Sequence, residues 1–478
     1  MNFEVSPPDQ VLWIWRTLEE AGFETWIVGG AIRDLMFGRP AGDWDFATKA
    51  RPEEVMAAFR RTVPIGVDHG TVGVLAADGT LYEVTTFRKD VQTFGRRAVV
   101  EFAEAIETDL SRRDFTVNAL AWHPGRQELL DPWNGSVDLS ERILRTVGEP
   151  AERFAEDLLR VLRALRFAGQ FALTIDEGAW QALLAAVPEL SELSAERIQE
   201  EMMKVLSQAE RPSIALGLYA ESGVFGALYP EIDVGSDAPA EDPSGVPVVD
   251  AAGTASGFAR SLLACDNVSP TRPLVRLALL FARVSATDTR SGSTDTRAGT
   301  SDAKRSVIEG LMERLRFSSA DTRRVAAVSA SISPAPPADD SVGLRRWLHR
   351  VGPEHFSDIG RAWLADARVE ARVGEGEGVD APSTKDSEMG VTSTGAVIHR
   401  IREIRAILRS DPPLAIADLA LDGADLKELG LTPGPQFGEI LRYLLNEVLE
   451  RPELNNRKDL AALAERGGFL GAHPSTES

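Results

Sequence analysis

The hydrophobic pattern of the chain changes near residue 140, and this change limits the possible architectures more than any other feature. Before it, short runs rich in β-branched and aromatic residues are bounded by Gly and Asp, a pattern typical of strands. After it, apolar residues recur at spacings of three and four, as in the run 158–165, which predicts helices. The expected early elements are strands at 26–28, 71–75 and 81–86 and helices at about 9–21 and 51–60. The sequence therefore predicts a mixed α+β head followed by an all-α remainder.

The length of 478 residues indicates several structural units, because single domains usually hold roughly 100 to 200 residues. Three stretches are rich in Gly, Pro, Ser, Thr or acidic residues: 235–257, 285–304 and 374–395. Such compositions bury too little apolar surface to offset the entropy of ordering, so we expect flexible insertions in the first two and a linker in the third. The predicted units are a head at 1–140, a helical neck at 141–206, a helical body at 207–373 and a helical tail at 396–478.

The net charge of −21 argues against a partner that is a polyanion, because phosphate contacts need clustered Lys and Arg. Any nucleic-acid site must therefore be a local basic surface. Two groups of basic residues qualify: Arg145, Arg153, Arg160, Arg163 and Arg166, and His399, Arg400, Arg402, Arg405 and Arg409. A solvated helix face is the alternative for each group, and sequence position alone leaves both readings open.

No run of about 18 apolar residues is present, and the first ten residues lack the basic and apolar regions of a signal peptide. We therefore expect a soluble, cytoplasmic protein with no membrane partner. Cys265 is the single cysteine, which excludes an intramolecular disulfide and disfavours a cysteine-based metal site. We expect Cys265 to be a small buried hydrophobic residue.

Gly29 and Gly30 follow the expected strand at 26–28, and Arg33 comes one helical turn later. Glycines at the end of a strand let backbone amides approach an anion closely, and an arginine nearby can pair with a phosphate oxygen. This pattern predicts a phosphate site. A Gly-Gly turn that binds nothing is the alternative.

Asp43 and Asp45 alternate with Trp44 and Phe46. The side-chain period of a strand is two, so both carboxylates should lie on one face and both rings on the other. Two adjacent carboxylates repel each other unless a cation lies between them, and Mg²⁺ prefers oxygen ligands and substrate phosphates. The pair therefore predicts a Mg²⁺ site, with a solvated edge strand as the alternative.

The residues 29–34 and 43–45, Gly-Gly-x-x-Arg-Asp followed by Asp-x-Asp, resemble motif A of the bacterial-type (class II) tRNA nucleotidyltransferases. This family also includes poly(A) polymerases and belongs to the polymerase-β-like superfamily. Four further segments resemble the family's motifs in the same order: Asp109–Leu120, Asp131–Gly135 with Asp138, Leu139 and Arg145, Glu156–Arg163, and Glu196–Ile198 with Glu200 and Glu201. Five motifs in order make the resemblance specific for residues 25–205.

The resemblance implies a polymerase-β-like nucleotidyltransferase head, a neck that selects the nucleotide and a tail that binds tRNA. It implies addition of CCA to the tRNA 3′ end from CTP and ATP, with Mg²⁺ held by Asp43 and Asp45 and release of pyrophosphate. The residues that match nucleotide-binding positions of the family are Gly29, Gly30, Arg33, Arg113, Asp157, Arg160, Arg163 and Arg166. Arg112 is expected to support the fold or tRNA. Glu83 is our candidate for a third metal carboxylate, against a cross-strand ion pair.

Asp157 and Arg160 are three residues apart, which places them on one face if the helix is continuous. Together they offer an acceptor for the exocyclic amine of cytosine or adenine and a donor for the neighbouring ring atoms. The alternative is an ordinary ion pair within the helix. Successive steps of three drift around a helix, so Arg163 should lie partly aside and Arg166 nearly opposite to Asp157.

Beyond the neck the resemblance thins. Many relatives carry His and Asp where this chain has Ala282 and Arg283, so we expect no phosphohydrolase activity. Glycines at 423, 430, 434 and 438 resemble the family's tail and predict either a phosphate contact or a plain helix-turn-helix packing unit. Addition of A alone, addition of CC alone, poly(A) tailing and a non-catalytic RNA-binding protein are the alternative functions. The segment 86–97, part of which CC-adding relatives lack, favours full CCA addition, and the oligomeric state stays open.

Overall fold

The computed structural model describes residues 5–94, 97–234, 257–284, 301–332, 340–375 and 394–469. It forms two compact units, Met1–Pro230 and Glu231–Ser478. Strands of the main sheet occur only in the first part of the described chain, and helices make up most of the rest, as the hydrophobic pattern predicts. The finer division into head, neck, body and tail stays a prediction. The predicted insertions and linker at 235–257, 285–304 and 374–395 lie largely outside the described residues.

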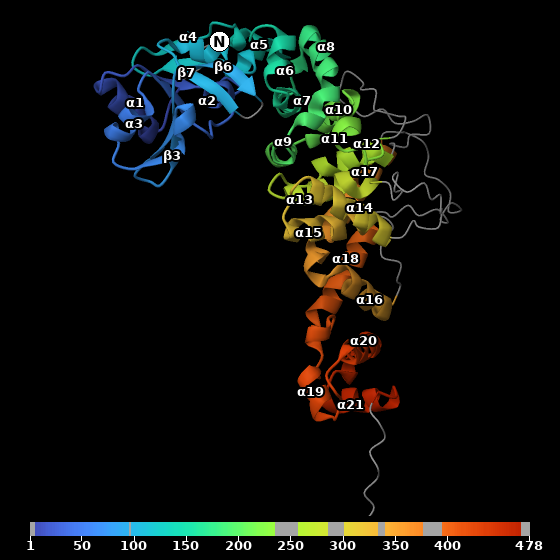
Figure 1. The fold of residues 1–478 in the computed structure, drawn as a ribbon. Coiled ribbons are helices and arrows are strands. Elements are labelled where there is room, and N and C mark those ends of the chain that lie inside the picture. Colours follow the sequence, from blue (N-terminus) through green and yellow to red (C-terminus); the bar gives the residue numbers. More distant parts are fainter. Residues whose placement is uncertain are drawn as a thin grey trace, which may run out of the picture. The chain divides into compact units, whose positions relative to one another are not determined.

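A seven-stranded sheet forms the centre of the head, with the strand order β3-β4-β5-β2-β1-β8-β9. β1 pairs antiparallel with β2 and β8, whereas β2 and β5 run parallel. The strands are β1 (Thr25–Val28), β2 (Asp45–Thr48), β3 (Thr62–Gly66), β4 (Thr71–Leu75), β5 (Leu81–Thr86), β8 (Ala121–His123) and β9 (Glu128–Leu130). The predicted strands are confirmed to within one residue, and Figure 1 shows this part of the chain in blue and cyan.

Five helices accompany the sheet: α1 (Asp9–Glu20), α2 (Gly30–Met36), α3 (Pro52–Ala58), α4 (Ile106–Ser111) and α5 (Gly135–Glu141). The predicted helices at 9–21 and 51–60 correspond to α1 and α3. All four residues of β1 are buried, because this strand lies between β2 and β8. A cluster of buried side chains, including Trp26 and Val28 from β1 and Leu110 from α4, forms the core on one side of the sheet. The central strands are therefore apolar on both faces, and polar groups appear where strands begin or end.

The segment between motif A and Arg112 forms a second sheet of its own. β6 (Arg88–Phe94) pairs antiparallel with β7 (Arg97–Phe102). The register pairs Arg88 with Phe102 and Phe94 with Arg97.

Helices form the rest of the first unit. They are α6 (Pro150–Glu156), α7 (Leu159–Phe171), α8 (Glu177–Ala186), α9 (Ala195–Gln208), α10 (Pro212–Glu221) and α11 (Val224–Leu228), with a short parallel pair β10 (Ile143–Leu144) and β11 (Thr174–Ile175). α7 and α10 approach so closely at Gly169 that a Cβ there would lie 2.5 Å from the Ala215 Cβ. The small residue therefore permits the crossing that buries α7 on nearly all sides.

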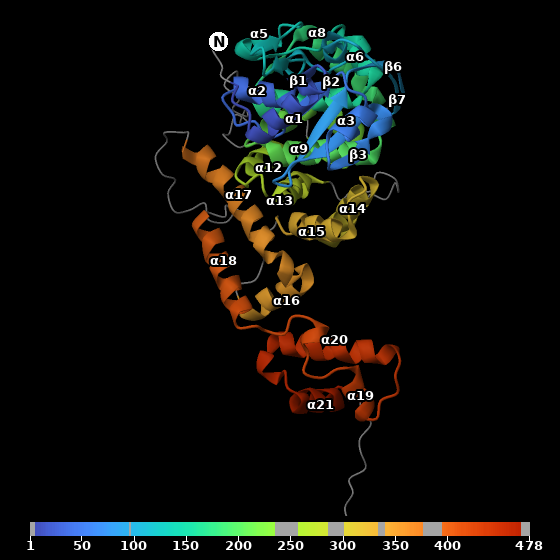
Figure 2. The ribbon, with the colours of Figure 1, turned by 90° about the vertical axis from the view of Figure 1, so that its left-hand side faces the viewer.

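The described part of the second unit is helical. Its helices are α12 (Gly257–Asp266), α13 (Pro273–Leu280), α14 (Ser301–Arg314), α15 (Ser319–Ala330), α16 (Ser341–Val351), α17 (Phe356–Glu375), α18 (Thr394–Arg409), α19 (Gly423–Glu428), α20 (Pro435–Glu450) and α21 (Arg457–Arg466). Figure 2 shows α19, α20 and α21 packed together. Cys265 is buried, as predicted, and none of the described helices combines the length and the apolar character that crossing a bilayer requires.

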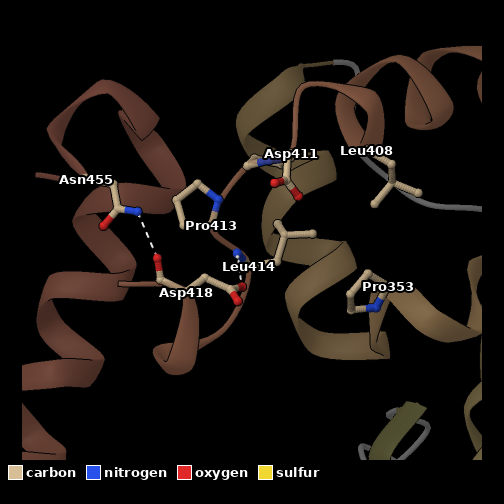
Figure 3. Close-up of a pocket in the computed structure, with 8 residues that line it drawn as sticks. Pro353, Leu408, Asp411, Pro413, Leu414, Asp418 and Asn455 are labelled. Atoms are coloured by element: carbon tan, nitrogen blue, oxygen red, sulfur yellow. Dashed lines mark hydrogen bonds between the residues drawn. The ribbon is translucent and has the colours of Figure 1, made fainter. Parts of the chain in front are cut away.

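A pocket of about 540 Å³ lies in the second unit, beside the end of α18 (Figure 3). Its polar groups already serve the fold. Asp418 Oδ2 accepts from the amides of Leu414 and Ala415 at 3.0 and 2.8 Å, and Asn455 Nδ2 donates to the Asp418 carbonyl at 2.9 Å. Asn455 Oδ1 accepts from the Ala420 amide at 2.8 Å. These hydrogen bonds stabilise the segment between α18 and α19. The predicted catalytic residues all belong to the other unit.

Candidate active site

The two predicted metal ligands lie at the start of β2. Asp45 is the first residue of the strand and is half-buried, and Asp43 is exposed just before it. The rings alternate with them on the other face, because Trp44 is 7% exposed and Phe46 is fully buried. The predicted separation of carboxylates from rings is confirmed. The rings anchor the segment in the core, and the carboxylates remain outside it.

Glu83 lies next to Asp45 on the neighbouring strand. The parallel pairing of Phe46 with Val84 brings the preceding residues, Asp45 and Glu83, to the same level. Burial, together with the negative charges of Glu83 and Asp43, raises the pKa of Asp45 to about 6, and Arg113 opposes this rise. Among the described residues Glu83 forms no ion pair, and both interpretations of Glu83, a third metal carboxylate or a cross-strand ion pair, stay predictions.

The donor set fits a divalent cation. A cation beside Asp45 would offset the repulsion that raises its pKa, and carboxylate oxygens are the ligands that Mg²⁺ prefers. Within the described ranges, three acidic, His or Cys side chains do not converge on one metal position. Asp43 and Asp45 therefore remain the predicted pair of ligands, and Glu83 acts on Asp45 through its charge.

The backbone conformation at Gly29 favours glycine, and the residue lies close to Arg113. Its φ of +73° lies in the region that favours glycine. A Cβ on Gly29 would also lie 2.7 Å from Nη1 of Arg113. The Gly-Gly turn thus begins α2 and leaves room for Arg113. A Cβ on Gly30 would lie 3.5 Å from Arg33 Nη2, which is an ordinary van der Waals distance.

Arg33 is 8% exposed, and neighbouring side chains surround its guanidinium. Nε and Nη2 donate to Asp34 Oδ1 at 2.9 and 2.7 Å, and Nη1 donates to Asn118 Oδ1 at 2.6 Å. The Phe171 ring of α7 lies 4.4 Å below the guanidinium carbon. Arg33 therefore links the head to α7, and the predicted phosphate contact would require it to exchange one of these partners.

Asp109 holds the two arginines that follow α4. It is 1% exposed, and its Oδ1 accepts from Nε and Nη2 of Arg112 at 3.0 and 2.8 Å. Its Oδ2 accepts from Nη2 of Arg113 at 3.3 Å. Burial raises the pKa of Asp109, but the two guanidinium charges outweigh it and leave the pKa lowered. Arg113, the predicted nucleotide-binding residue, thereby lies close to Gly29, and its charge acts on Asp45. Whether Arg112 serves the fold or tRNA stays open.

Asp157 and Arg160 do not lie on one continuous helix, so the predicted geometry of this pair is wrong. α6 ends at Glu156, Asp157 is extended with φ of −154°, and α7 begins at Leu159. The Asp157 carboxylate accepts from the Leu159 amide at 3.1 Å, which satisfies a free N–H in the first turn of α7. A residue whose side chain caps a helix has non-helical backbone. A continuous helix through Asp157 is therefore excluded, and α6 and α7 are separate helices.

The two side chains also have different partners, so the alternative of an ion pair between them is wrong as well. Asp157 Oδ2 pairs with Nη2 of Arg197 at 2.7 Å. Arg160 Nη1 donates to Glu156 at 2.5 Å, and its Nη2 donates to the Arg112 carbonyl at 3.3 Å. Arg197 and Glu156 lie within segments that resemble family motifs, but helical periodicity gives no reason to single out either residue.

Arg163 and Arg166 face different parts of the first unit, as the helical drift predicts. Arg163 Nη2 lies 2.6 Å from Asp114 Oδ2, so it points to the head. Arg166 is 5% exposed, and its Nε donates to Glu201 of α9 at 2.7 Å. Burial raises the pKa of Glu201, but Arg166 and Lys204 outweigh it, and the pKa is lowered. Arg166 therefore joins two helices of the neck in this structure.

Two family models match parts of the chain. A family model described as the poly A polymerase head domain matches residues 25–145, and one described as a probable RNA and SrmB-binding site of polymerase A matches residues 172–235. The CCA-adding enzymes of Geobacillus thermodenitrificans and Anoxybacillus flavithermus are each 44% identical, over 223 and 225 residues. These matches cover 46% and 47% of this chain and 54% and 56% of those proteins, about half of their length.

The structure of the Bacillus stearothermophilus CCA-adding enzyme in complex with CTP is similar over 97% of this chain and 98% of that chain. The TM-score is 0.66 and the sequence identity is 29%. The first family model covers the part of the chain that contains the glycine turn, Asp43, Asp45 and Arg113. Residues 25–145 are therefore similar to the poly A polymerase head domain, and residues 172–235 are similar to the probable RNA-binding site of polymerase A.

Proposed function

We propose that the chain adds CCA to the 3′ end of tRNA from CTP and ATP without a nucleic-acid template. The observation that carries the proposal is the placement of Asp45 at the start of β2, with Asp43 just before the strand and with the charges of Asp43 and Arg113 acting on Asp45. The relatives named CCA-adding enzymes, which match about half of their own length, support it. A cytoplasmic location is part of the proposal.

Asp43 and Asp45 would hold Mg²⁺. When bound, Mg²⁺ ions supply charge stabilisation to the attacking 3′ oxygen and to the departing pyrophosphate. The protein's own contribution is to place the triphosphate against these carboxylates. The charge of Arg113 acts on Asp45, so this arginine is proposed to bind the triphosphate. The amides after Gly29 offer further donors. Glu83 is proposed to strengthen cation binding at Asp45 through its negative charge.

Nucleotide selection is assigned to Asp157 and Arg160, which flank the break between α6 and α7. An acceptor and a donor fork at this break can match the polarity that cytosine and adenine share and that uracil and guanine lack. Arg197 and Glu156 would orient the two groups by their ion pairs. Arg33, Arg163 and Arg166 complete the set of proposed nucleotide-binding residues.

Addition of A alone, addition of CC alone and poly(A) tailing are the alternatives that an extension assay separates. Purified protein is incubated with tRNA transcripts that end at the discriminator base, at C or at CC, with CTP, ATP or both. We expect all three transcripts to be completed to CCA and extension to stop there. Extension only of the CC transcript, arrest at CC, or a long A tail would each replace the proposal with the corresponding alternative.

Binding of Mg²⁺ is expected to weaken as the pH falls through about 6, the pKa of Asp45. The metal binds the ionised carboxylate, so protons compete with it below that pKa, and a single proton weakens binding by about tenfold per pH unit. The effect of the Asp45 pKa on the free energy of unfolding has the opposite sign. A raised carboxyl pKa means that the folded protein binds this proton more tightly than the unfolded chain, so without metal this group favours folding more as the pH falls from 7 toward 4.

Mg²⁺ titrations followed by initial rate and by Tm between pH 5 and 8 measure both effects. Asp45→Asn, which cannot ionise, is the matched control and should remove the pH dependence of the Mg²⁺-induced change in Tm. An apparent Mg²⁺ affinity that is the same at pH 5 and pH 7 would contradict the role of Asp45.

A further inference from the structure

The sheet face that carries the carboxylates of the head also carries an exposed apolar surface. Ile65 of β3 and Leu81 of β5 are 44% and 46% exposed, and Val63 of β3 is 41% exposed. Gly73 of β4 lies between the two strands, and a Cβ there would be 2.6 Å from Ile65 Cδ1 and 2.9 Å from Leu81 Cδ1. The missing side chain at Gly73 therefore lets these two side chains approach each other above β4. We call Val63, Ile65 and Leu81 the apolar platform.

The strand register connects the apolar platform to the predicted metal site. Val63 pairs with Gly73, and Gly73 pairs with Glu83, so these positions form one row on one face of the sheet. The parallel pairing of β2 with β5 brings Asp45 to the level of Glu83. Leu81 precedes Glu83 by two residues on the same strand, which places the two about 7 Å apart on the same face. The platform therefore begins directly beside the carboxylates.

The opposite face of these strands belongs to the core of the head. Val72 and Val74 of β4 and Val84 of β5 are fully buried, and α3 packs against both strands. The alternation along each strand thus separates a covered apolar face from a face on which three large aliphatic side chains remain exposed together. Isolated exposed aliphatic residues are ordinary, but a group of them beside polar groups marks a binding surface.

The proposed triphosphate donors lie on the other side of Asp45 in the sheet. Val28, the last residue of β1, pairs with Asp45, and the Gly29 turn follows it. The strand order places β1 on one side of β2 and β5, β4 and β3 on the other. In phosphoryl transfer the attacking and leaving oxygens are roughly in line on opposite sides of the phosphorus. A triphosphate held at the Gly29 turn therefore leaves the β5 side, with the apolar platform, for the attacking 3′ hydroxyl.

We propose that the apolar platform holds the 3′-terminal nucleoside of tRNA while its hydroxyl attacks. The inference rests on the proposed function, because it assumes that the acceptor is a tRNA that grows by CCA. During this reaction the terminal base is first the discriminator base, then C, and then C again. A site for it must therefore tolerate any base.

The chemistry of the platform meets this requirement. Its three aliphatic side chains carry no hydrogen-bond donor or acceptor, so they cannot read the edge of a base. They can contact the ribose and the face of any base, and contact with base faces tolerates every sequence. The incoming nucleotide has the opposite requirement, because it must be selected by its hydrogen-bonding groups. The platform therefore fits the acceptor nucleoside and not the base of CTP or ATP.

The test changes the platform and the tRNA together. The acceptors are tRNA ending at CC and the same tRNA without the base of its last nucleotide, each extended with ATP. With the wild-type protein, removal of the base should lower kcat/KM for tRNA about tenfold. With the double variant Ile65→Thr, Leu81→Thr, the two acceptors should be extended almost equally, because the base has lost its contact. Threonine suits a strand and both side chains are already half exposed, so we expect this variant to fold.

A second variant and a matched control complete the experiment. In Gly73→Ala the new Cβ displaces the ends of the Ile65 and Leu81 side chains, so the effect of removing the base should shrink as well. Val137→Thr is the control, because Val137 is a 47% exposed aliphatic residue on α5 of the same head. It should keep the wild-type ratio between the two acceptors. The KM for ATP should stay unchanged in all these variants.

A wild-type ratio between the two acceptors in the folded double variant would overturn the inference and leave the proposed function intact. The same ratio with a raised KM for ATP would assign the platform to the incoming base, and with an altered sedimentation coefficient to contact with a second copy of the chain; both results would overturn it too. If the double variant does not fold, Gly73→Ala decides by the same ratio. Failure of the wild-type protein to extend any tRNA refutes the proposed function itself.

Discussion

Asp43→Ala and Asp45→Ala are each expected to abolish nucleotidyl transfer while the protein remains folded. Each substitution removes a ligand for Mg²⁺, and metal stabilisation of a phosphoryl transition state is worth several kcal/mol, or roughly a thousandfold or more in rate. Neither change opens the core, because Asp43 is exposed and Asp45 is half-buried beside two other carboxylates. Removal of Asp45 should even relieve repulsion in the metal-free protein.

Single-turnover extension of a tRNA ending at CC, together with Tm, measures this prediction. Glu53→Ala is the control, because Glu53 is an exposed acid on α3 of the same head and should leave the rate unchanged. Glu83→Ala should give an intermediate loss if its charge helps Asp45 to hold the cation. Extension at the wild-type rate by either aspartate variant would refute the metal assignment.

Asp157→Ala is expected to slow incorporation of CTP and ATP and to admit UTP or GTP. The carboxylate is the proposed acceptor for the exocyclic amine, and without it the donors of Arg160 remain to pair with carbonyl groups. Loss of one charge-assisted hydrogen bond costs about 1.5 to 3 kcal/mol, which is roughly tenfold to more than a hundredfold in discrimination. Steady-state incorporation of each of the four triphosphates measures the change directly.

The structure supplies a sharper variant of this experiment. Asp157 also accepts from the Leu159 amide, so Asp157→Ala removes a helix cap as well as the proposed acceptor. Asp157→Asn keeps an oxygen for the cap and replaces the other with a donor. Altered selectivity at an unchanged Tm in Asp157→Asn would assign selection to the polarity of the side chain. Unchanged selectivity in both variants would mean that Asp157 serves only the cap and the pair with Arg197.

Local periodicity was sufficient to predict the strands and helices expected in the head. The alternation of Asp43, Trp44, Asp45 and Phe46 correctly predicted which side chains are buried, because the pleat of a strand depends only on consecutive residues. The burial of Cys265 and the separate directions of Arg163 and Arg166 were likewise predictable from composition and helical geometry. The family resemblance added the identity of the motifs, which periodicity does not supply.

The partners of the charged residues depended on tertiary structure. Asp157 was expected to share a helix face with Arg160, but its capping of α7 and its pairing with Arg197, forty positions away, determine its conformation. Asp114 and Asn118 lie within a segment that resembles a family motif, but nothing in the sequence showed that they connect Arg33 to Arg163. Sequence alone determined which faces are apolar, since that follows from local geometry. Only the tertiary structure decided which carboxylate meets which arginine, because buried charges must find partners wherever the fold brings them together.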